Sequence, residues 1–197
     1  MRKPRRWTGY SSTGCFTRES IIGDQTHCNP YVVKAISLII PKGDSILDIG
    51  SGRGWYVLAL RDLGYNVDGV DGADGIEEIS RSLVRKCDLT VMGALQSLSY
   101  DWGVFISVGE HIPKQFESVV IDNVSTVSRK GLIVAWGPPN QPGRGHVNCQ
   151  PLSYIRDQFM QREFYVDAEA ISLLNSCLVK RKSKGRFLVL RRGVLNG

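Results

Sequence analysis

The chain has 197 residues, of which 42% are hydrophobic, and a formal net charge of +6. This length favours a single domain over residues 1–197, because a second hydrophobic core needs more chain. Every apolar stretch is far shorter than the roughly 20 residues of a membrane-spanning helix, and the basic N-terminus lacks the apolar core of a signal peptide. We therefore expect a cytoplasmic protein without a membrane partner.

The cysteines bear on the redox compartment, and the charges bear on a possible RNA partner. Cys15, Cys28, Cys87, Cys149 and Cys177 are scattered and form no C-x-x-C pair. This pattern is typical of reduced thiols in a cytosol-like compartment and not of a disulfide framework or a zinc site. Basic residues gather near both ends of the chain, which is typical either of an RNA-binding surface or of solvated tails.

In chain order, residues 1–28 come first. They are rich in Gly, Ser and Thr, show no sustained period, and are expected to be largely irregular. Asn29 and Pro30 suit the start of a helix, and the apolar stripe that follows predicts a helix ending before Pro41.

A glycine turn follows. Residues 46–49 form an apolar β-type run, which leads through Gly50, Gly52 and Gly54 into a helix predicted over 55–63. Glycines let the backbone turn sharply and let a ligand lie against bare N–H groups, where a Cβ would collide with it. The order strand, glycine turn and helix therefore predicts a site for a nucleotide-type ligand.

The rest of the chain alternates between strands and helices. We expect strands at 66–71, 83–87, 103–108, 131–136 and 186–191, and helices at 76–80, after Pro113, at 152–164 and at 167–177. This alternation predicts an α/β fold with a doubly wound, mainly parallel sheet and helices on both faces. A long Gly/Pro-rich loop at 137–150 is typical of a substrate-binding segment.

Asp71 ends the strand after the glycine turn, where its carboxylate is suited to ribose hydroxyls. In such folds, ligands bind beyond the carboxyl ends of the strands, where the strand order reverses. A nicotinamide dinucleotide would also bind at a glycine turn and an acid that ends the next strand. However, Trp55 follows the G-x-G-x-G run at the point where the dinucleotide fingerprint continues to a later glycine.

The D-I-G-S-G-R-G run of residues 48–54 resembles the first motif of the class I S-adenosylmethionine-dependent methyltransferases. Asp71 is similar to their ribose-binding acid and Asp88 to the acid beside the adenine amine, and the resemblance covers residues 45–136. It implies a seven-stranded-type sheet with an antiparallel last strand, S-adenosylmethionine as cofactor, and Asp48 facing the methionine portion. The implied cofactor site comprises Asp48, Gly50, Ser51, Gly52, Gly54, Asp71, Gly72, Asp88, Leu89 and Ser107.

The fourth predicted strand ends in I-S-V-G-E-H-I-P, which is similar to the strand ending of ubiquinone-biosynthesis-type O-methyltransferases and of small-RNA 2′-O-methyltransferases. In the latter, an E-x-x-E-H run and a distant His hold a divalent metal beside the acceptor hydroxyl. Here Glu110 and His111 match, whereas Ser107 replaces the first Glu. We therefore assign no metal ligands, although two neighbours and one further imidazole leave a metal site open.

The sequence has three histidines, His27, His111 and His146, each in a predicted loop. In the fold that the resemblance implies, these loops border the methyl-transfer centre, and the segment before the first helix folds over it as a lid. We expect His27, His111 and His146 to act there with Glu110 as catalytic residues, since imidazole titrates in the range useful for a general base. The alternative is that each histidine only contacts backbone or solvent.

The sequence thus predicts an enzyme that moves a methyl group from S-adenosylmethionine to an O or N nucleophile of a small-molecule acceptor. An RNA 2′-O- or cap-type methyltransferase, with or without a metal, is an alternative that the basic ends favour. A catalytically silent domain that binds the cofactor or a partner is a further alternative, supported by Ser107 in place of the first Glu.

Overall fold

The computed structural model describes residues 9–24, 28–179 and 185–193. Within these residues, seven strands form one sheet in the order β3-β2-β1-β4-β5-β7-β6. β7 runs antiparallel to its neighbours β5 and β6, whereas the other neighbouring pairs are parallel. The predicted sheet with its antiparallel last strand is confirmed. The strands are β1 Ser45–Ile49, β2 Asn66–Asp71, β3 Val84–Lys86, β4 Tyr100–Ile106, β5 Ser128–Ala135, β6 Phe164–Val166 and β7 Phe187–Arg192.

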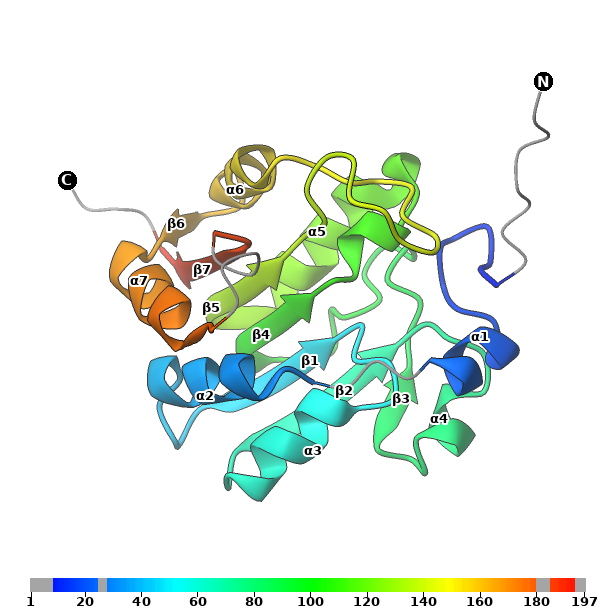
Figure 1. Cartoon of the computed structure of the whole chain (residues 1–197), viewed down its shortest axis with the longest axis horizontal. Coiled ribbons are helices and arrows are strands. Elements are labelled where there is room, and N and C mark those ends of the chain that lie inside the picture. Colours follow the sequence, from blue (N-terminus) through cyan, green and yellow to red (C-terminus); the bar gives the residue numbers. More distant parts are fainter. Residues whose placement is uncertain (1–8, 25–27, 180–184, 194–197) are drawn as a thin grey trace.

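Helices cover both faces of the sheet (Figure 1). α2, α3 and α7 pack on one face, and α5 and α6 on the other. No helix in the described part of the chain is long and apolar enough to cross a membrane. The helices are α1 Arg18–Gly23, α2 Pro30–Ile39, α3 Trp55–Asp62, α4 Ile76–Ile79, η1 Gly109–His111, η2 Lys114–Phe116, α5 Glu117–Val127, α6 Leu152–Met160 and α7 Ala168–Cys177.

Side-chain caps start several of these helices. The Asn29 side chain accepts a hydrogen bond from the Tyr31 N–H at 3.0 Å, and Pro30 occupies the first turn of α2, as predicted. The Asp167 side chain caps α7 in the same way, through the Ala170 N–H at 2.9 Å.

Within the segment expected to be largely irregular, α1 forms a short helix with Thr17 as its cap and Ile21 buried against α4. Two expectations about the bounds of elements are wrong. The helix predicted over 152–164 ends at Met160, and Phe164–Val166 pairs with β7 as a short strand. The strand predicted over 103–108 runs instead over Tyr100–Ile106, and residues 107 and 108 lie beyond its end.

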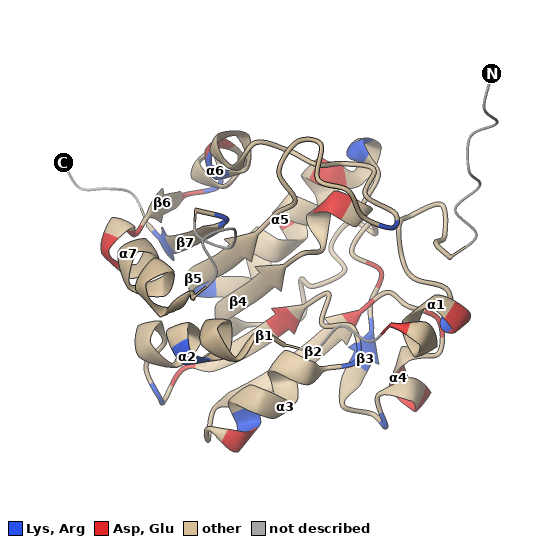
Figure 2. Cartoon of the chain, viewed as in Figure 1, with Lys and Arg blue, Asp and Glu red and all other residues tan. Residues whose placement is uncertain are grey.

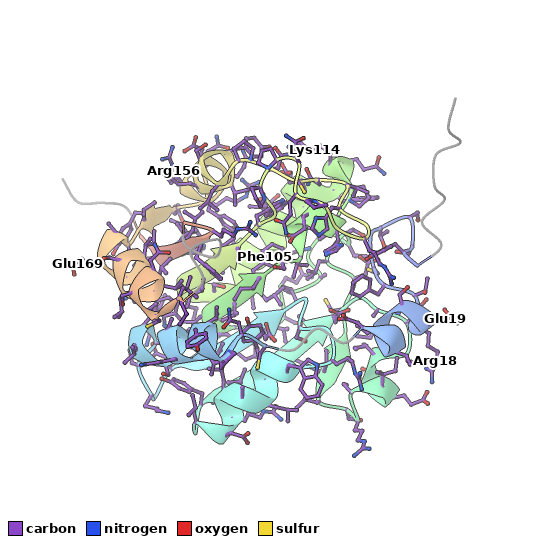
Figure 3. All side chains as sticks on the ribbon, in the orientation of Figure 1. Arg18, Glu19, Phe105, Lys114, Arg156 and Glu169 are labelled. Carbon is purple, nitrogen blue, oxygen red and sulfur yellow. The ribbon has the colours of Figure 1, made fainter. Side chains whose placement is uncertain are left out.

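The core lies on both sides of β4. Trp102 and Phe105 are fully buried, the first against α2, α3 and α7 and the second against α5 and α6, as alternating strand side chains require. Figure 3 shows Phe105 at the centre of the molecule and Lys114, Arg156 and Glu169 at its periphery.

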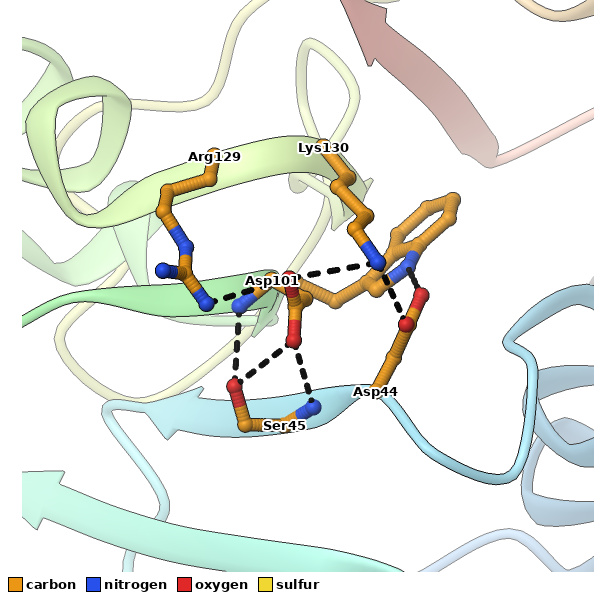
Figure 4. Close-up of polar contacts among 6 residues, drawn as sticks. Asp44, Ser45, Asp101, Arg129 and Lys130 are labelled. Carbon is orange, nitrogen blue, oxygen red and sulfur yellow. Dashed lines mark hydrogen bonds and ion pairs between the residues drawn. The ribbon is translucent and has the colours of Figure 1, made fainter.

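A polar network ties the amino ends of β1, β4 and β5 (Figure 4). Asp44 accepts hydrogen bonds from Trp102 Nε1 at 3.0 Å and from Lys130 Nζ at 2.6 Å, and Asp101 accepts one from the Ser45 N–H at 3.0 Å. Arg129 pairs with Asp101 at 3.1 Å. This network fixes the register of the central strands at the edge opposite their carboxyl ends.

Candidate active site

A cavity of about 930 Å³ lies at the carboxyl ends of β1, β2 and β4. This is where the strand order reverses, between β1 and β4, as expected for a ligand site in a doubly wound sheet. Gly54 does not line the cavity, and His27 lies outside the described residues. The predicted site residues that line it are Asp48, Gly50, Ser51, Gly52, Asp71, Gly72, Asp88, Leu89, Ser107, Glu110, His111 and His146.

The three glycines of the turn differ in what a Cβ at each position would contact. All have positive φ, of 73°, 53° and 83° for Gly50, Gly52 and Gly54. A Cβ on Gly50 would lie 2.4 Å from Val108, and one on Gly54 2.6 Å from Leu83, so these two allow close packing. At Gly52, the nearest atom would be 3.9 Å away. Gly52 is therefore the glycine whose bare backbone faces open space in the cavity.

Asp48 is a buried acid without a partner. Its side chain lies near the end of β1 with 3% of the residue exposed, and its Oδ2 atom has no hydrogen-bond partner among the described residues. Burial raises the pKa of Asp48 to about 8, and the neighbouring charge of Asp71 adds to the shift. An orphaned carboxyl group beside a cavity fits a ligand that brings a cationic group.

Asp71, at the end of β2, is held by backbone donors. Its Oδ2 accepts a hydrogen bond from the Gly52 N–H at 2.8 Å and its Oδ1 one from the Ala73 N–H at 2.8 Å. Burial raises the pKa of Asp71, although these two bonds oppose the shift. Each oxygen keeps acceptor capacity for a ligand hydroxyl.

Asp88 and Leu89 line the cavity after β3. Asp88 Oδ1 accepts hydrogen bonds from the N–H and the hydroxyl of Thr90, at 2.9 and 2.7 Å. Asn123 on α5 donates to the Leu89 carbonyl at 2.8 Å and so holds this segment against the sheet.

The exit of β4 is strained and tightly packed. Ser107 has a φ of 57°, a left-handed conformation that costs a non-glycine residue about 1–3 kcal/mol. A Cβ on Gly109 would lie 2.3 Å from the Trp136 ring, so only glycine fits there. Glu110 follows in η1 with 1% of the residue exposed, and its Oε2 has no partner among the described residues. Burial raises the pKa of Glu110, while a hydrogen bond from the Gly137 backbone lowers it.

His111 and His146 meet at the cavity, with ring centroids 4.9 Å apart and rings inclined by 80°. Burial lowers the pKa of His111 to about 4, so its ring is neutral near pH 7. Its Nδ1 atom is buried and has no partner among the described residues. His146 Nδ1 lies 3.2 Å from the Gln141 carbonyl, which can only accept a hydrogen bond, so Nδ1 is assigned as the donor.

Glu110, His111 and His146 form a compact group, with one ligand atom of each within 4.8 Å of the others. The Gln141 carbonyl lies against His146 Nδ1, whereas Glu110 Oε2 and His111 Nδ1 have no partner among the described residues. Two imidazoles and one carboxylate suit a divalent cation such as Zn²⁺ or Mn²⁺, and they equally suit proton transfer.

The N-terminal segment contributes Tyr10 and Phe16 to the cavity, two residues that the expectation of a lid did not name. The Tyr10 ring stacks on the His111 ring at 5.7 Å, the Phe16 ring meets it edge-on at 5.6 Å, and the Tyr10 hydroxyl donates to the Arg144 carbonyl at 2.7 Å. Figure 1 shows the loop after β5, in yellow, reaching this blue N-terminal segment. The only signal in the sequence is a pair of aromatic residues that flank a Ser/Thr/Gly turn.

A second cavity of about 200 Å³ adjoins the first. The two cavities share Tyr56, Ser107 and Glu110, and the smaller one extends to Arg186 and Phe187 at the start of β7. Figure 2 shows acidic segments at the ends of the central strands and also on α1, α3, α4 and α7, and basic segments dispersed over the molecule, β3 included. The predicted basic cluster at residues 2–6 and the part of the C-terminal cluster at 180–184 lie outside the described residues. Of the rest of the C-terminal cluster, Arg191 donates to Asp167 and Arg192 to the Ser125 carbonyl.

No protein-family model and no curated protein sequence match this chain. Several solved structures, however, are similar to it. Magnesium protoporphyrin IX methyltransferase from Synechocystis, with bound S-adenosylhomocysteine, is 17% identical, with a TM-score of 0.63 over 89% of this chain and 92% of that chain. A TehB-like S-adenosylmethionine-dependent methyltransferase from Corynebacterium glutamicum is 14% identical, with a TM-score of 0.62 over 88% and 91%.

A third similar structure is 1,6-didemethyltoxoflavin-N1-methyltransferase from Burkholderia thailandensis, which holds its acceptor and S-adenosylhomocysteine. It is 14% identical, with a TM-score of 0.57 over 89% of this chain and 82% of that chain. The chain therefore has the fold of the class I S-adenosylmethionine-dependent methyltransferases, as the sequence predicts.

Proposed function

We propose that this protein is a methyltransferase that uses S-adenosylmethionine to methylate an O or N nucleophile of a small-molecule acceptor. The observation that carries the proposal is the orphaned, buried carboxyl group of Asp48 beside the Gly52 turn. S-adenosylmethionine carries an ammonium group on its methionine portion, which would supply the missing partner. A nicotinamide dinucleotide carries no aliphatic ammonium group and would leave Asp48 unpaired.

The other predicted contacts are with the ribose and the adenine of the cofactor. Asp71 would accept hydrogen bonds from the ribose hydroxyls with its remaining lone pairs, and Asp88 would accept one from the adenine amine. Both acids line the same cavity as Asp48. Gly52 leaves room for the cofactor to lie against the backbone.

When bound, S-adenosylmethionine supplies a methyl group already activated by its sulfonium. The protein then has to align the acceptor, exclude water and take up one proton. His146 would accept that proton at Nε2 as the bond from the acceptor O or N to the methyl carbon forms and the carbon–sulfur bond breaks. Neutral His111, packed between Tyr10, Phe16 and His146, would form the wall of the acceptor site.

Glu110, His111 and His146 favour a second candidate, a metal-assisted RNA 2′-O-methyltransferase, because their ligand atoms lie within 4.8 Å of one another. A divalent ion held by them would lower the pKa of an acceptor hydroxyl. In that case both histidines are ligands, and neither is free to accept a proton.

A cytoplasmic location is part of the proposal. All five cysteines are free in the structure. Free thiols are typical of a reducing compartment.

Transfer of tritium from methyl-labelled S-adenosylmethionine tests the proposal. Total metabolite extract and total RNA serve as separate acceptor pools, and each is assayed with and without a chelator. Label in the small-molecule fraction that survives the chelator supports the first candidate. Label in RNA that the chelator abolishes supports the second, and no label in either pool contradicts both.

A further inference from the structure

The segment that carries His146 has no helix or strand between Ala135 and Leu152. A segment of this kind needs specific side-chain bonds to hold a catalytic group within reach of its partners. Four of its hydrogen bonds involve one residue, Asn148, which is 3% exposed.

Asn148 uses both its backbone groups and both ends of its side chain. Its N–H donates to the Glu110 carbonyl at 3.0 Å, and its own carbonyl accepts from Trp136 Nε1 at 2.7 Å. Its Nδ2 donates to Glu117 Oε2 at 2.8 Å, and its Oδ1 accepts from Gln150 Nε2 at 2.7 Å. The Asn148 amide therefore has a single possible orientation.

Glu117 is the counterpart on α5. Its residue is 4% exposed, and its Oε1 accepts hydrogen bonds from Lys114 Nζ and the Tyr154 hydroxyl, each at 2.6 Å. Burial alone raises the pKa of Glu117, but the bonds from Lys114, Tyr154 and Asn148 outweigh it and hold the pKa below its usual range. The carboxylate stays charged, and its Oε2 accepts from Asn148.

One hydrogen bond of Asn148 ends on the backbone carbonyl of Glu110. The N–H of Val147, the residue after His146, also donates to the Glu110 carbonyl, at 2.9 Å. The chain just beyond His146 is thus attached to Glu110, and His111 is the next residue. Loss of the Glu117–Asn148 bond therefore removes the attachment of this segment to α5.

We propose that Glu117 and Asn148 are positioning residues, whose buried hydrogen bond sets His146 against Glu110 and His111. This inference rests on the proposed role of His146 in methyl transfer. Neither residue lines the cavity, so neither touches cofactor or acceptor.

The pair can be tested by exchanging its charge and amide groups. Asn148→Asp sets a second buried carboxylate against Glu117 Oε2, and Glu117→Gln sets an amide against either Asn148 or Lys114. In the double variant E117Q/N148D, the amide introduced at position 117 donates to the carboxylate introduced at position 148. The amide oxygen still accepts from Lys114 and Tyr154. Each single change disrupts the bond, whereas the double change rebuilds it with groups of the same shape.

The first readout needs no acceptor. Because the chain has only three histidines, NMR of the imidazole protons resolves His146 and its nuclear Overhauser contact with His111. We expect Asn148→Asp to shift the His146 signals and remove the contact, and E117Q/N148D to restore both. Asn123→Asp is the matched control, since Asn123 is likewise a buried asparagine but holds Leu89, and it should leave the His146 signals unchanged.

The second readout is kinetic, with the acceptor found in the tritium assay. We expect Asn148→Asp to lower kcat roughly tenfold or more, with unchanged affinity for S-adenosylhomocysteine, and the double variant to recover kcat. Wild-type His146 signals in Asn148→Asp, or a folded double variant that lacks the contact, would overturn the inference. If Asn148→Asp does not fold, the double variant alone tests the inference: the His146–His111 contact supports it when present and overturns it when absent. If the double variant restores the NMR contact but the wild type transfers no label in the tritium assay, the proposed function is refuted while the positioning role is supported.

Discussion

The carboxylate of Asp71 accepts a hydrogen bond of 2.8 Å from the backbone N–H of Gly52. The acid at the end of β2 thereby holds the glycine turn that follows β1. Asp48 lies on the other side of the turn, and its Oδ2 has no partner among the described residues. Two neighbouring acids thus differ: Asp71 holds the backbone of the turn, whereas Asp48 keeps an oxygen without a partner among the described residues.

Asp71→Asn should weaken cofactor binding at least tenfold, which corresponds to about 1.4 kcal/mol. The new amide cannot accept from Gly52 and Ala73 at once, so the turn loses its support and the ribose one acceptor. Calorimetric titration with S-adenosylhomocysteine measures the effect. Asp68→Asn is the control, since Asp68 lies on the same strand but pairs with Arg61 outside the cavity. Equal affinities of Asp71→Asn and the wild type would refute the ribose assignment.

Cofactor binding should release protons near pH 7. Asp48 has a pKa of about 8 and is therefore mostly protonated without a ligand. An ammonium group beside it favours the charged carboxylate, so the pKa falls and a proton leaves. Titrations in buffers of different ionisation enthalpy measure this release, and Asp48→Asn should abolish it. A binding enthalpy that is the same in every buffer would exclude the Asp48 contact.

Asp48 also makes the stability of the free protein depend on pH. Its folded-state pKa of about 8 is above the ordinary value of 3.8, so the folded protein holds the extra proton between these values. The corresponding stability is complete below the ordinary value and is lost as the pH rises through about 8. Melting curves at pH 6 and pH 9 should therefore show a larger fall in Tm for the wild type than for Asp48→Asn. Parallel falls would mean that Asp48 is charged in the free protein.

His146→Ala should lower turnover by roughly 10²–10⁴-fold, the usual contribution of a general base. Affinity for S-adenosylhomocysteine should not change, because His146 packs against His111, on the side of the cavity proposed for the acceptor. Steady-state kinetics and calorimetry separate the two quantities. Wild-type turnover in this variant would mean that the Gly/Pro loop encloses the acceptor without taking its proton.

Gly54→Ala should destabilise the protein more than Gly64→Ala. Both glycines have a left-handed φ, of 83° and 81°, and this conformation costs either alanine about 1–2 kcal/mol. Only at Gly54 does the new Cβ meet a neighbour, Leu83 at 2.6 Å, which adds about 1–3 kcal/mol of overpacking. Urea unfolding measures the difference. Equal losses would show that Leu83 moves aside freely.

Local patterns in the sequence predicted the sheet and the cofactor side of the cavity. Asp48, Gly52 and Asp71 lie within short runs that combine a strand, a turn and an acid, so their spacing carries the information. The same pattern did not reveal that Gly54 serves packing against Leu83, because that contact comes from a distant segment.

The acceptor side was predicted only in part, since it is built from long-range contacts. Glu110, His111 and His146 were named from their motif and their rarity. The stacking of Tyr10 on His111 and the bond from Glu117 to Asn148 join segments that are far apart in the chain. Neither contact leaves a local pattern, and both become visible only once the sheet has brought the segments together.

Calorimetric titration of the wild-type protein with S-adenosylmethionine tests the central claim most directly. We predict one molecule bound per chain, with a proton released at pH 7 and no competition from NADH. A titration in which S-adenosylmethionine gives no binding while NADH binds would contradict the account.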